Sequence, residues 1–216
     1  ENLLTRNIER APNNEEVINN LVRIQRWREK PQQAEQTLNR LNGIEPRSKS
    51  TSINQMQNQQ ALGDISAWRN QTMHLSQRYP TDTSVIKSHK ELADRERFSI
   101  SHDSRFSESK ADQNQVLETL KGTKDFESTT RLNSPWMHDN YRVFTQYKHR
   151  MGDYREGKIR DERLGLGGEW DSKQKSMSVM LSQDLDGDDL GFDANWNHRL
   201  DDHWRYNLGF STQADI

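Results

Sequence analysis

The sequence has no cysteine, so it can form neither a disulfide nor a reactive thiolate. It also has no run of 18 or more apolar residues, which excludes a transmembrane helix. Hydrophobic residues make up only 30% of the 216 residues, which argues against one large dry core. Acidic and basic side chains nearly balance, 33 against 31, so the overall charge does not favour nucleic acid. Because the N-terminal stretch lacks the basic and apolar regions of a signal peptide, we expect a mature segment.

Proline is scarce, and three of the five prolines are evenly spaced. Pro12, Pro46 and Pro80 lie 34 residues apart, which is the period of the tetratricopeptide repeat, where proline closes the second helix. Apolar residues at helical spacing precede the two later prolines; they are Ala34, Leu38 and Leu41, then Ile65, Trp68 and Leu75. We therefore predict tetratricopeptide-type α-helical repeats over residues 1–96. The alternative is a generic helical bundle in which each proline simply ends a helix.

The first helices of such repeats form a concave surface on which these superhelices bind partners. The phase of the repeat places one set of polar side chains there: Asn19, Arg23, Arg26, Gln57, Gln60, Lys87 and Glu91. We predict that these residues line a partner-binding groove. The alternative is that they are only solvated.

From residue 97 onward, the period of the apolar residues changes to two. Four runs with this alternation cover 98–106, 126–132, 141–147 and 164–170, and three more end the chain. In those last three runs the apolar set is Met177, Val179 and Leu181, then Leu190, Phe192, Ala194 and Trp196, then Trp204, Tyr206, Leu208 and Phe210. This pattern predicts seven antiparallel strands. Long or Asp/Gly-rich loops at 107–124, 151–157 and 184–189 alternate with compact turns at 133–138, 171–175 and 199–203.

One apolar face, one polar face and alternating loop lengths are typical of an outer-membrane β-barrel. The tryptophans Trp136, Trp170, Trp196 and Trp204 fall near the compact turns, where an interfacial aromatic girdle would lie. Single-chain barrels have an even number of strands, so we expect further strands after residue 216. The predicted fold class is α and β multidomain: periplasmic helical repeats over 1–96, then the first strands of a barrel over 97–216. A solvated sheet in a soluble sandwich is the alternative.

Strand parity also predicts which charged side chains face the lumen. The acidic candidates for guiding a cationic polymer are Asp103, Glu127, Glu169, Asp184 and Asp193, and basic residues on the same face outnumber them. The 7 histidines show no metal-ligand spacing, and the aspartates at 184–189 lack the spacing of a calcium loop. We therefore expect no catalytic residue, no metal and no cofactor.

Several short stretches follow one another in a distinctive order. They are RAPNN at 10–14, QAEQTL at 33–38, IEPR at 44–47, ELADR at 91–95, NSP at 133–135 and the hairpin at 191–207. Together with a helical array that leads into a barrel, they resemble the poly-β-1,6-N-acetyl-D-glucosamine export porins, the PgaA/HmsH family. The resemblance runs through the whole chain.

The resemblance implies export of partly deacetylated poly-β-1,6-N-acetyl-D-glucosamine, a biofilm exopolysaccharide, through an acidic lumen. It implies three partners: the cationic polymer, a periplasmic polymer deacetylase at the repeats, and outer-membrane lipid around the barrel. The alternative function is a soluble periplasmic repeat scaffold whose β-domain acts in protein-complex assembly without transport.

Overall fold

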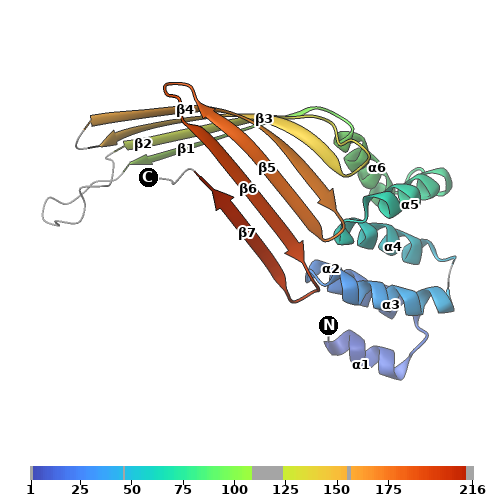
Figure 1. The fold of residues 1–216 in the computed structure, drawn as a ribbon. Helices are drawn as coiled ribbons and strands as arrows, with labels where there is room; N and C mark the ends of the chain where they lie inside the picture. The colour runs from blue at the N-terminus through green and yellow to red at the C-terminus, as the bar shows by residue number, and fades with distance from the viewer. Residues whose placement is uncertain (1, 46, 109–123, 155–156, 213–216) are drawn as a thin grey trace, which may run out of the picture.

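A computed structural model describes residues 2–45, 47–108, 124–154 and 157–212 of the chain. Over these residues, six helices are followed by one seven-stranded sheet, and the helices lie along one end of the strands (Figure 1). This arrangement confirms the predicted fold class. Among the described residues, no helix is both long and apolar enough to cross a membrane.

The helices repeat at the predicted interval. They are α1 (Asn2–Arg10), α2 (Glu15–Trp27), α3 (Pro31–Ile44), α4 (Lys49–Leu62), α5 (Ile65–Arg78) and α6 (Thr83–Arg95). The starts of α2, α4 and α6 are 34 residues apart, as are the starts of α3 and α5 (49 − 15, 83 − 49 and 65 − 31). Helices α2, α4, α5 and α6 each have an N-cap residue whose side chain accepts a hydrogen bond from a backbone N–H of the first turn. These N-cap residues are Asn14, Ser48, Asp64 and Asp82.

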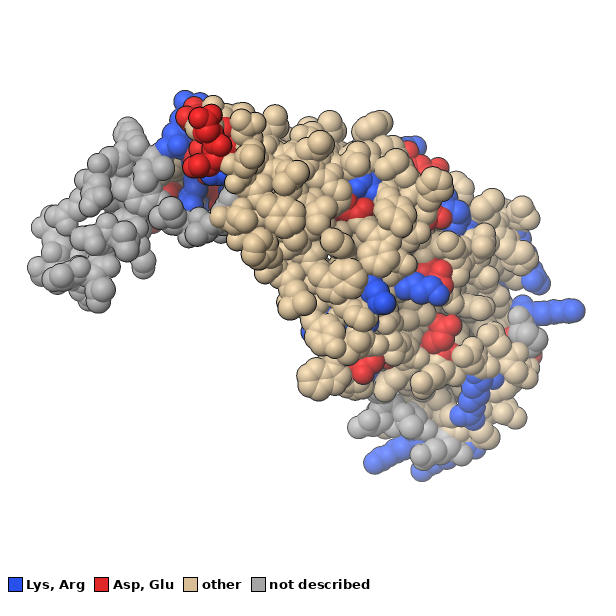
Figure 2. All heavy atoms as spheres, in the orientation of Figure 1, with Lys and Arg blue, Asp and Glu red and all other residues tan. Residues whose placement is uncertain are grey.

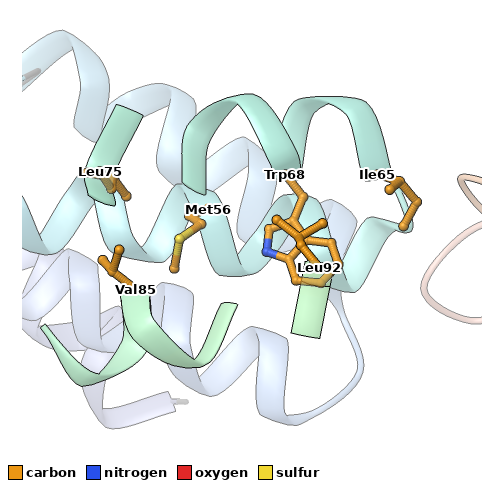
Figure 3. Close-up of a cluster of buried hydrophobic side chains, with 6 residues drawn as sticks. All are labelled: Met56, Ile65, Trp68, Leu75, Val85 and Leu92. Carbon is orange, nitrogen blue, oxygen red and sulfur yellow. The ribbon is translucent and has the colours of Figure 1, made fainter. Parts of the chain in front are cut away.

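The core of the array lies between consecutive helices. Figure 3 shows its largest cluster, in which α4, α5 and α6 contribute Met56, Ile65, Trp68, Leu75, Val85 and Leu92. Polar side chains complete the contact between α2 and α4, because the Asn54 amide donates to the Asn19 side chain at 2.7 Å. The array is therefore packed around buried apolar clusters, and the buried Asn19 and Asn54 side chains are hydrogen-bonded to each other.

The strands pair in sequence order and are all antiparallel. They are β1 (Ser99–Glu108), β2 (Lys124–Asn133), β3 (Tyr141–Tyr154), β4 (Gly157–Ser172), β5 (Lys175–Asp184), β6 (Leu190–Arg199) and β7 (Arg205–Ser211). The predicted boundary at 96 and 97 lies in the short link between α6 and β1. Most of the loop predicted at 107–124 lies outside the described residues.

The loop predicted at 151–157 is wrong, because β3 continues to Tyr154 and β4 begins at Gly157. Around this end of the hairpin, glycines and charged residues interrupt the alternation of apolar residues, so the sequence shows no strand pattern. Pairing of opposite charges across the strands supports the extension instead, since Arg150 stands opposite Asp161.

The two faces of the sheet differ as the alternation predicted. Leu166 stands opposite Leu181, and Leu181 stands opposite Phe192, so one row of apolar side chains crosses three strands on the outward face. All residues of β5, β6 and β7 are described. Apart from the residues at the strand ends, none of their outward-facing residues is charged. Figure 2 shows this face with a broad uncharged belt between charged ends.

The array is attached to the sheet through three turns. The α2–α3 loop meets the turn at 200–204, the α4–α5 loop meets the turn at 173–174, and the end of α6 meets the turn at 134–140. Two strands span about 9.5 Å across a sheet, and packed helices lie about 8–10 Å apart. Because these spacings are similar, each helical repeat meets one hairpin.

Backbone groups carry this attachment. The N–H groups of Gln32 and Gln33 donate to the two carboxylate oxygens of Asp202 at 3.1 and 2.8 Å. Helix α3 has no side-chain cap from its own N-cap residue, so the sheet supplies it. At the next turn, the Lys173 N–H donates to the Gly63 carbonyl at 3.0 Å.

Candidate functional site

The inward face carries all five acidic residues that parity selected. In the strand register, Asp103 stands opposite Thr129, and Glu127 stands opposite Arg105 and Arg150. Glu169 stands opposite Arg142 and Ser178, and Asp184 stands opposite Arg163. Asp193 stands opposite Met180 and Ser211. The structure therefore brings them onto one wall. Whether this wall guides a polymer stays a prediction.

Two of these carboxylates already have cationic partners. Glu169 forms ion pairs with both Arg131 and Arg142. The Lys148 ammonium lies 3.3 Å from the Glu127 carboxylate. A carboxylate between two guanidinium groups presents little net negative charge to a passing ligand, because the three charges sum to +1.

The other acidic residues differ from these two. The Asp184 carboxylate accepts the backbone N–H of Asp186 at 3.0 Å, which holds the beginning of the β5–β6 loop. The Asp193 carboxylate accepts the Ser211 hydroxyl at 2.6 Å. Within the described part of the chain, neither Asp193 nor Asp103 forms an ion pair. Asp193 is thus the best-placed uncompensated acid between paired strands.

A pocket of about 360 Å³ lies in this wall at the end nearest the helices. Its polar lining comes from the inward positions of four strands: Arg142 of β3, Glu169 and Asp171 of β4, Ser176 and Ser178 of β5, and Asn195 and Asn197 of β6. The Asn197 amide donates to Asn195 at 2.8 Å, so neighbouring amides orient one another. The pocket presents hydroxyl, amide and charged groups to whatever enters from the helical side.

Trp136 does not join the outward girdle, and its predicted place is wrong. Two guanidinium groups lie over its ring, that of Arg95 at 4.4 Å and that of the inward-facing Arg142 at 4.5 Å from the ring centre. The turn is held there because the Trp136 N–H donates to the Arg95 carbonyl at 2.9 Å. Burial lowers the pKa of Arg95, which also contacts the Asp139 carbonyl at 3.0 Å.

The remaining girdle is outward, as predicted. Trp170 and Trp196 stack with ring centres 6.0 Å apart, and His198 contacts both Trp196 and Tyr206 edge to face. Trp204 precedes β7 and is exposed. These rings lie at the helical end of the outward face, the level of a membrane–water interface.

The second candidate site is a groove of about 480 Å³ in the helical array. All seven residues predicted from the repeat phase line it: Asn19, Arg23, Arg26, Gln57, Gln60, Lys87 and Glu91. Sequence reasoning missed Trp27, which also lines the groove and is 71% exposed. The groove thus runs across α2, α4 and α6.

Side chains in the groove differ in what they bind. Arg26 donates to Gln57 at 2.6 Å and to Asn54, so it links α2 to α4. Burial, followed by the charge of Arg23, lowers the pKa of Arg26. Arg23 is exposed and lies 5.4 Å from the centre of the Trp27 ring. Arg26 therefore has a structural role, whereas Arg23 and Trp27 form an exposed cationic and aromatic surface.

The described residues hold no group of three or more His, Cys, Asp or Glu side chains placed to bind a metal. The sequence also offered no cofactor motif, so the sites are a polar wall and a groove.

A sheet with an apolar outer face, a polar inner face and an aromatic girdle beside its short turns defines a segment of an outer-membrane β-barrel. The family model described as the PgaA membrane beta barrel domain matches residues 105–214. The chain belongs to this family, whose barrel is an outer-membrane porin, and the resemblance seen in the sequence is confirmed. No curated protein and no solved structure matches the chain. The family match overturns the alternative of a soluble scaffold.

Proposed function

We propose that this porin exports partly deacetylated poly-β-1,6-N-acetyl-D-glucosamine from the periplasm. The observation that carries the proposal is the polar pocket at the helical end of the inward wall. Sugar hydroxyl and acetamido groups both donate and accept hydrogen bonds, as do the side chains of Ser178, Asn195 and Asn197. A polymer entering from the helical array meets this pocket first.

A few carboxylates on the inward wall support the proposal that the exported polymer is partly deacetylated. A glucosamine unit is an ammonium, and carboxylates along a pore select for cations. Glu169 and Glu127 are compensated by arginine and lysine, so Asp193 is the main electrostatic guide that we propose on this wall. Asp103 and Asp184 are secondary candidates.

The helical groove is proposed to bind the periplasmic polymer deacetylase. Tryptophan and arginine are enriched among residues that dominate protein–protein affinity. Trp27 and Arg23 lie together at one end of the groove and are exposed. A deacetylase held there would release modified polymer beside the barrel entrance.

The transport proposal is tested by substitutions at Asp193 in the full-length protein. Asp193→Glu keeps the charge, Asp193→Asn removes it, and Asp193→Lys reverses it. We expect secretion of the polymer to fall in that order, while heat-modifiable migration in a detergent gel shows normal barrel assembly. Equal secretion by all three assembled variants contradicts a guiding role for Asp193. If all three variants lose secretion to the same extent, whatever the charge at position 193, the electrostatic mechanism is contradicted.

The partner proposal is tested with Arg23→Glu and Trp27→Ala, measured by pull-down of the deacetylase. Each is expected to weaken binding about tenfold or more, since residues of this kind contribute about 2 kcal/mol at interfaces. Arg26 is kept unchanged because its hydrogen bonds hold α2 against α4. Lys90→Glu is the control, because Lys90 is exposed on α6 and does not line the groove. A partner captured equally by all variants binds elsewhere.

A further inference from the structure

A notch of about 540 Å³ opens between the outward side of the sheet's helical end and helices α3 and α4. On the sheet side it is lined by Trp170, Lys175 and His198, and on the helix side by Glu35, Gln59 and Asp64. The notch shares only Trp170 with the pocket in the inward wall and no residue with the helical groove, so it is a third site.

The outward aromatic residues indicate where the notch lies relative to the membrane. Trp170 lines the notch and stacks on Trp196, and His198 contacts Trp196 edge to face. Such rings lie at the level of lipid headgroups. Lys175 stands directly opposite His198 in the strand register, with the outward parity of Met177. Headgroups of the periplasmic leaflet thus reach the mouth of the notch.

Charges in the notch are ordered along the direction away from the membrane. Lys175 lies at the strand end, nearer the membrane, and it forms no ion pair among the residues that the structure describes. Glu35 lies on the helical array, farther into the periplasm. Lys173 and Asp64 close the remaining side with an ion pair of 3.3 Å.

Glu35 is a half-buried carboxylate without a cation. It accepts the amides of Asn58 at 2.9 Å and of Gln59 at 3.5 Å, and within the described ranges it has no ion-pair partner. Such a carboxylate is stabilised when a cation enters beside it. The notch therefore offers a cation near the membrane and an uncompensated anion beyond it.

We propose that this notch binds the headgroup of a zwitterionic phospholipid of the ethanolamine type. In that headgroup the phosphate is attached to the glycerol and the ammonium lies beyond it, which is the order of charges that the notch complements. The phosphate contacts Lys175, the ammonium contacts Glu35, and the acyl chains lie along the outward face beside Trp170. A bound lipid of this kind joins the barrel wall to the helical array.

The experiment uses the full-length protein in nanodiscs that contain equal amounts of phosphatidylethanolamine and phosphatidylglycerol, followed by native mass spectrometry. The wild-type protein should retain phosphatidylethanolamine preferentially. Lys175→Gln should lower retention of both lipids about tenfold, the loss expected for one charge-assisted hydrogen bond. Glu35→Gln should keep total retention but abolish the preference for ethanolamine, because it removes only the anion.

Lys90→Gln on α6 is the matched control and should retain lipid like the wild type. Assembly of each variant is checked by heat-modifiable migration, and Glu35→Gln lies in the array, so it tests the proposal without altering a strand. A preference for phosphatidylglycerol, or retention that neither substitution changes, overturns the assignment. Binding of soluble phosphoethanolamine with no lipid retained would also overturn it.

Discussion

The helical array and the sheet place the same kinds of side chain in opposite locations. In the array, Met56 and Leu75 are 0% and 1% exposed, as in a soluble protein. In the sheet, Leu166 and Leu208 are both 68% exposed, and the polar side chains face inward. One chain thus contains a part built for water and a part built for lipid.

The comparison shows that a low hydrophobic content has two different meanings here. The array needs apolar residues only between its helices, and it fills the contact of α2 with α4 by amides such as Asn19 and Asn54. The sheet needs apolar residues on one face only. Composition averaged over the chain cannot separate these two cases, whereas the period of the apolar residues does.

The largest effect is expected where the array excludes water. Leu75→Ala removes a fully buried side chain of the cluster shown in Figure 3 and should destabilise the array by about 2–5 kcal/mol. Urea unfolding of the helical circular dichroism signal measures this loss. Leu208→Ala on the outward face of β7 is the matched change and should leave that signal unchanged. Equal effects would remove the distinction between the two parts.

A charge on the outward face tests the lipid-facing part. Phe192→Lys lies in the row of Leu166 and Leu181 and should cost roughly 2–4 kcal/mol near the middle of the bilayer, which lowers the heat-modifiable fraction. Gln146→Lys is the control, because Gln146 stands on the inward face opposite Gly165. If Phe192→Lys assembles normally and Gln146→Lys does not, the two faces are assigned the wrong way round.

The junction between the two parts should be sensitive to a single methyl group. Gly63 has a φ of 71°, and a Cβ there would lie 2.1 Å from the Lys173 carbonyl oxygen. Gly63→Ala should therefore break the contact with this turn and cost about 1–2 kcal/mol in backbone strain. Limited proteolysis of the α4–α5 loop measures the opening. Gly43→Ala in α3 is the matched control, because a Cβ there would meet no atom within 4 Å. Unchanged proteolysis in Gly63→Ala would show that this turn does not fix the array.

Much of this fold can be predicted from the sequence because it contains two regular periods, one of 34 residues in the helices and one of two residues in the strands. The interval between Pro12, Pro46 and Pro80 gives the helical repeat, and alternation in β5 to β7 gives the face of every side chain regardless of register. The groove followed for the same reason, since residues one repeat apart share a face. The extension of β3 and β4 did not follow, because glycines and charged residues interrupt the alternation there.

The chemistry of the inward wall was harder to predict. Parity placed Glu169 on the correct face, but only the register shows that Arg142 stands opposite it. Trp136 belongs to a turn, where alternation gives no direction. Asp202 caps α3 across a separation of 169 residues from Gln33, and no local pattern reports such a contact. Sites formed between the two parts, including the notch, were therefore absent from the sequence-based prediction.

The smallest expected effect concerns a titrating cap in the water-exposed array. The Asp82 carboxylate lies 2.9 Å from the Lys49 ammonium and accepts the Ser84 N–H at 2.9 Å. Lys49 first, and then these backbone donors, lower the pKa of Asp82 from its usual value. Asp82→Ala should destabilise the array by about 1 kcal/mol at neutral pH, whereas Asp82→Asn keeps the cap and should cost less.

The sign of the pH dependence follows from the lowered pKa. Because the folded-state pKa lies below the unfolded value of about 3.9, the Asp82 contribution is fully present above that value. It is lost as the pH falls through the folded pKa. Helical stability of the wild type, measured by urea unfolding, should therefore fall toward that of Asp82→Ala in this acidic window, and Asp82→Asn should lack this component. A difference between wild type and Asp82→Ala that stays constant down to the lowest pH would show that ionised Asp82 does not stabilise α6.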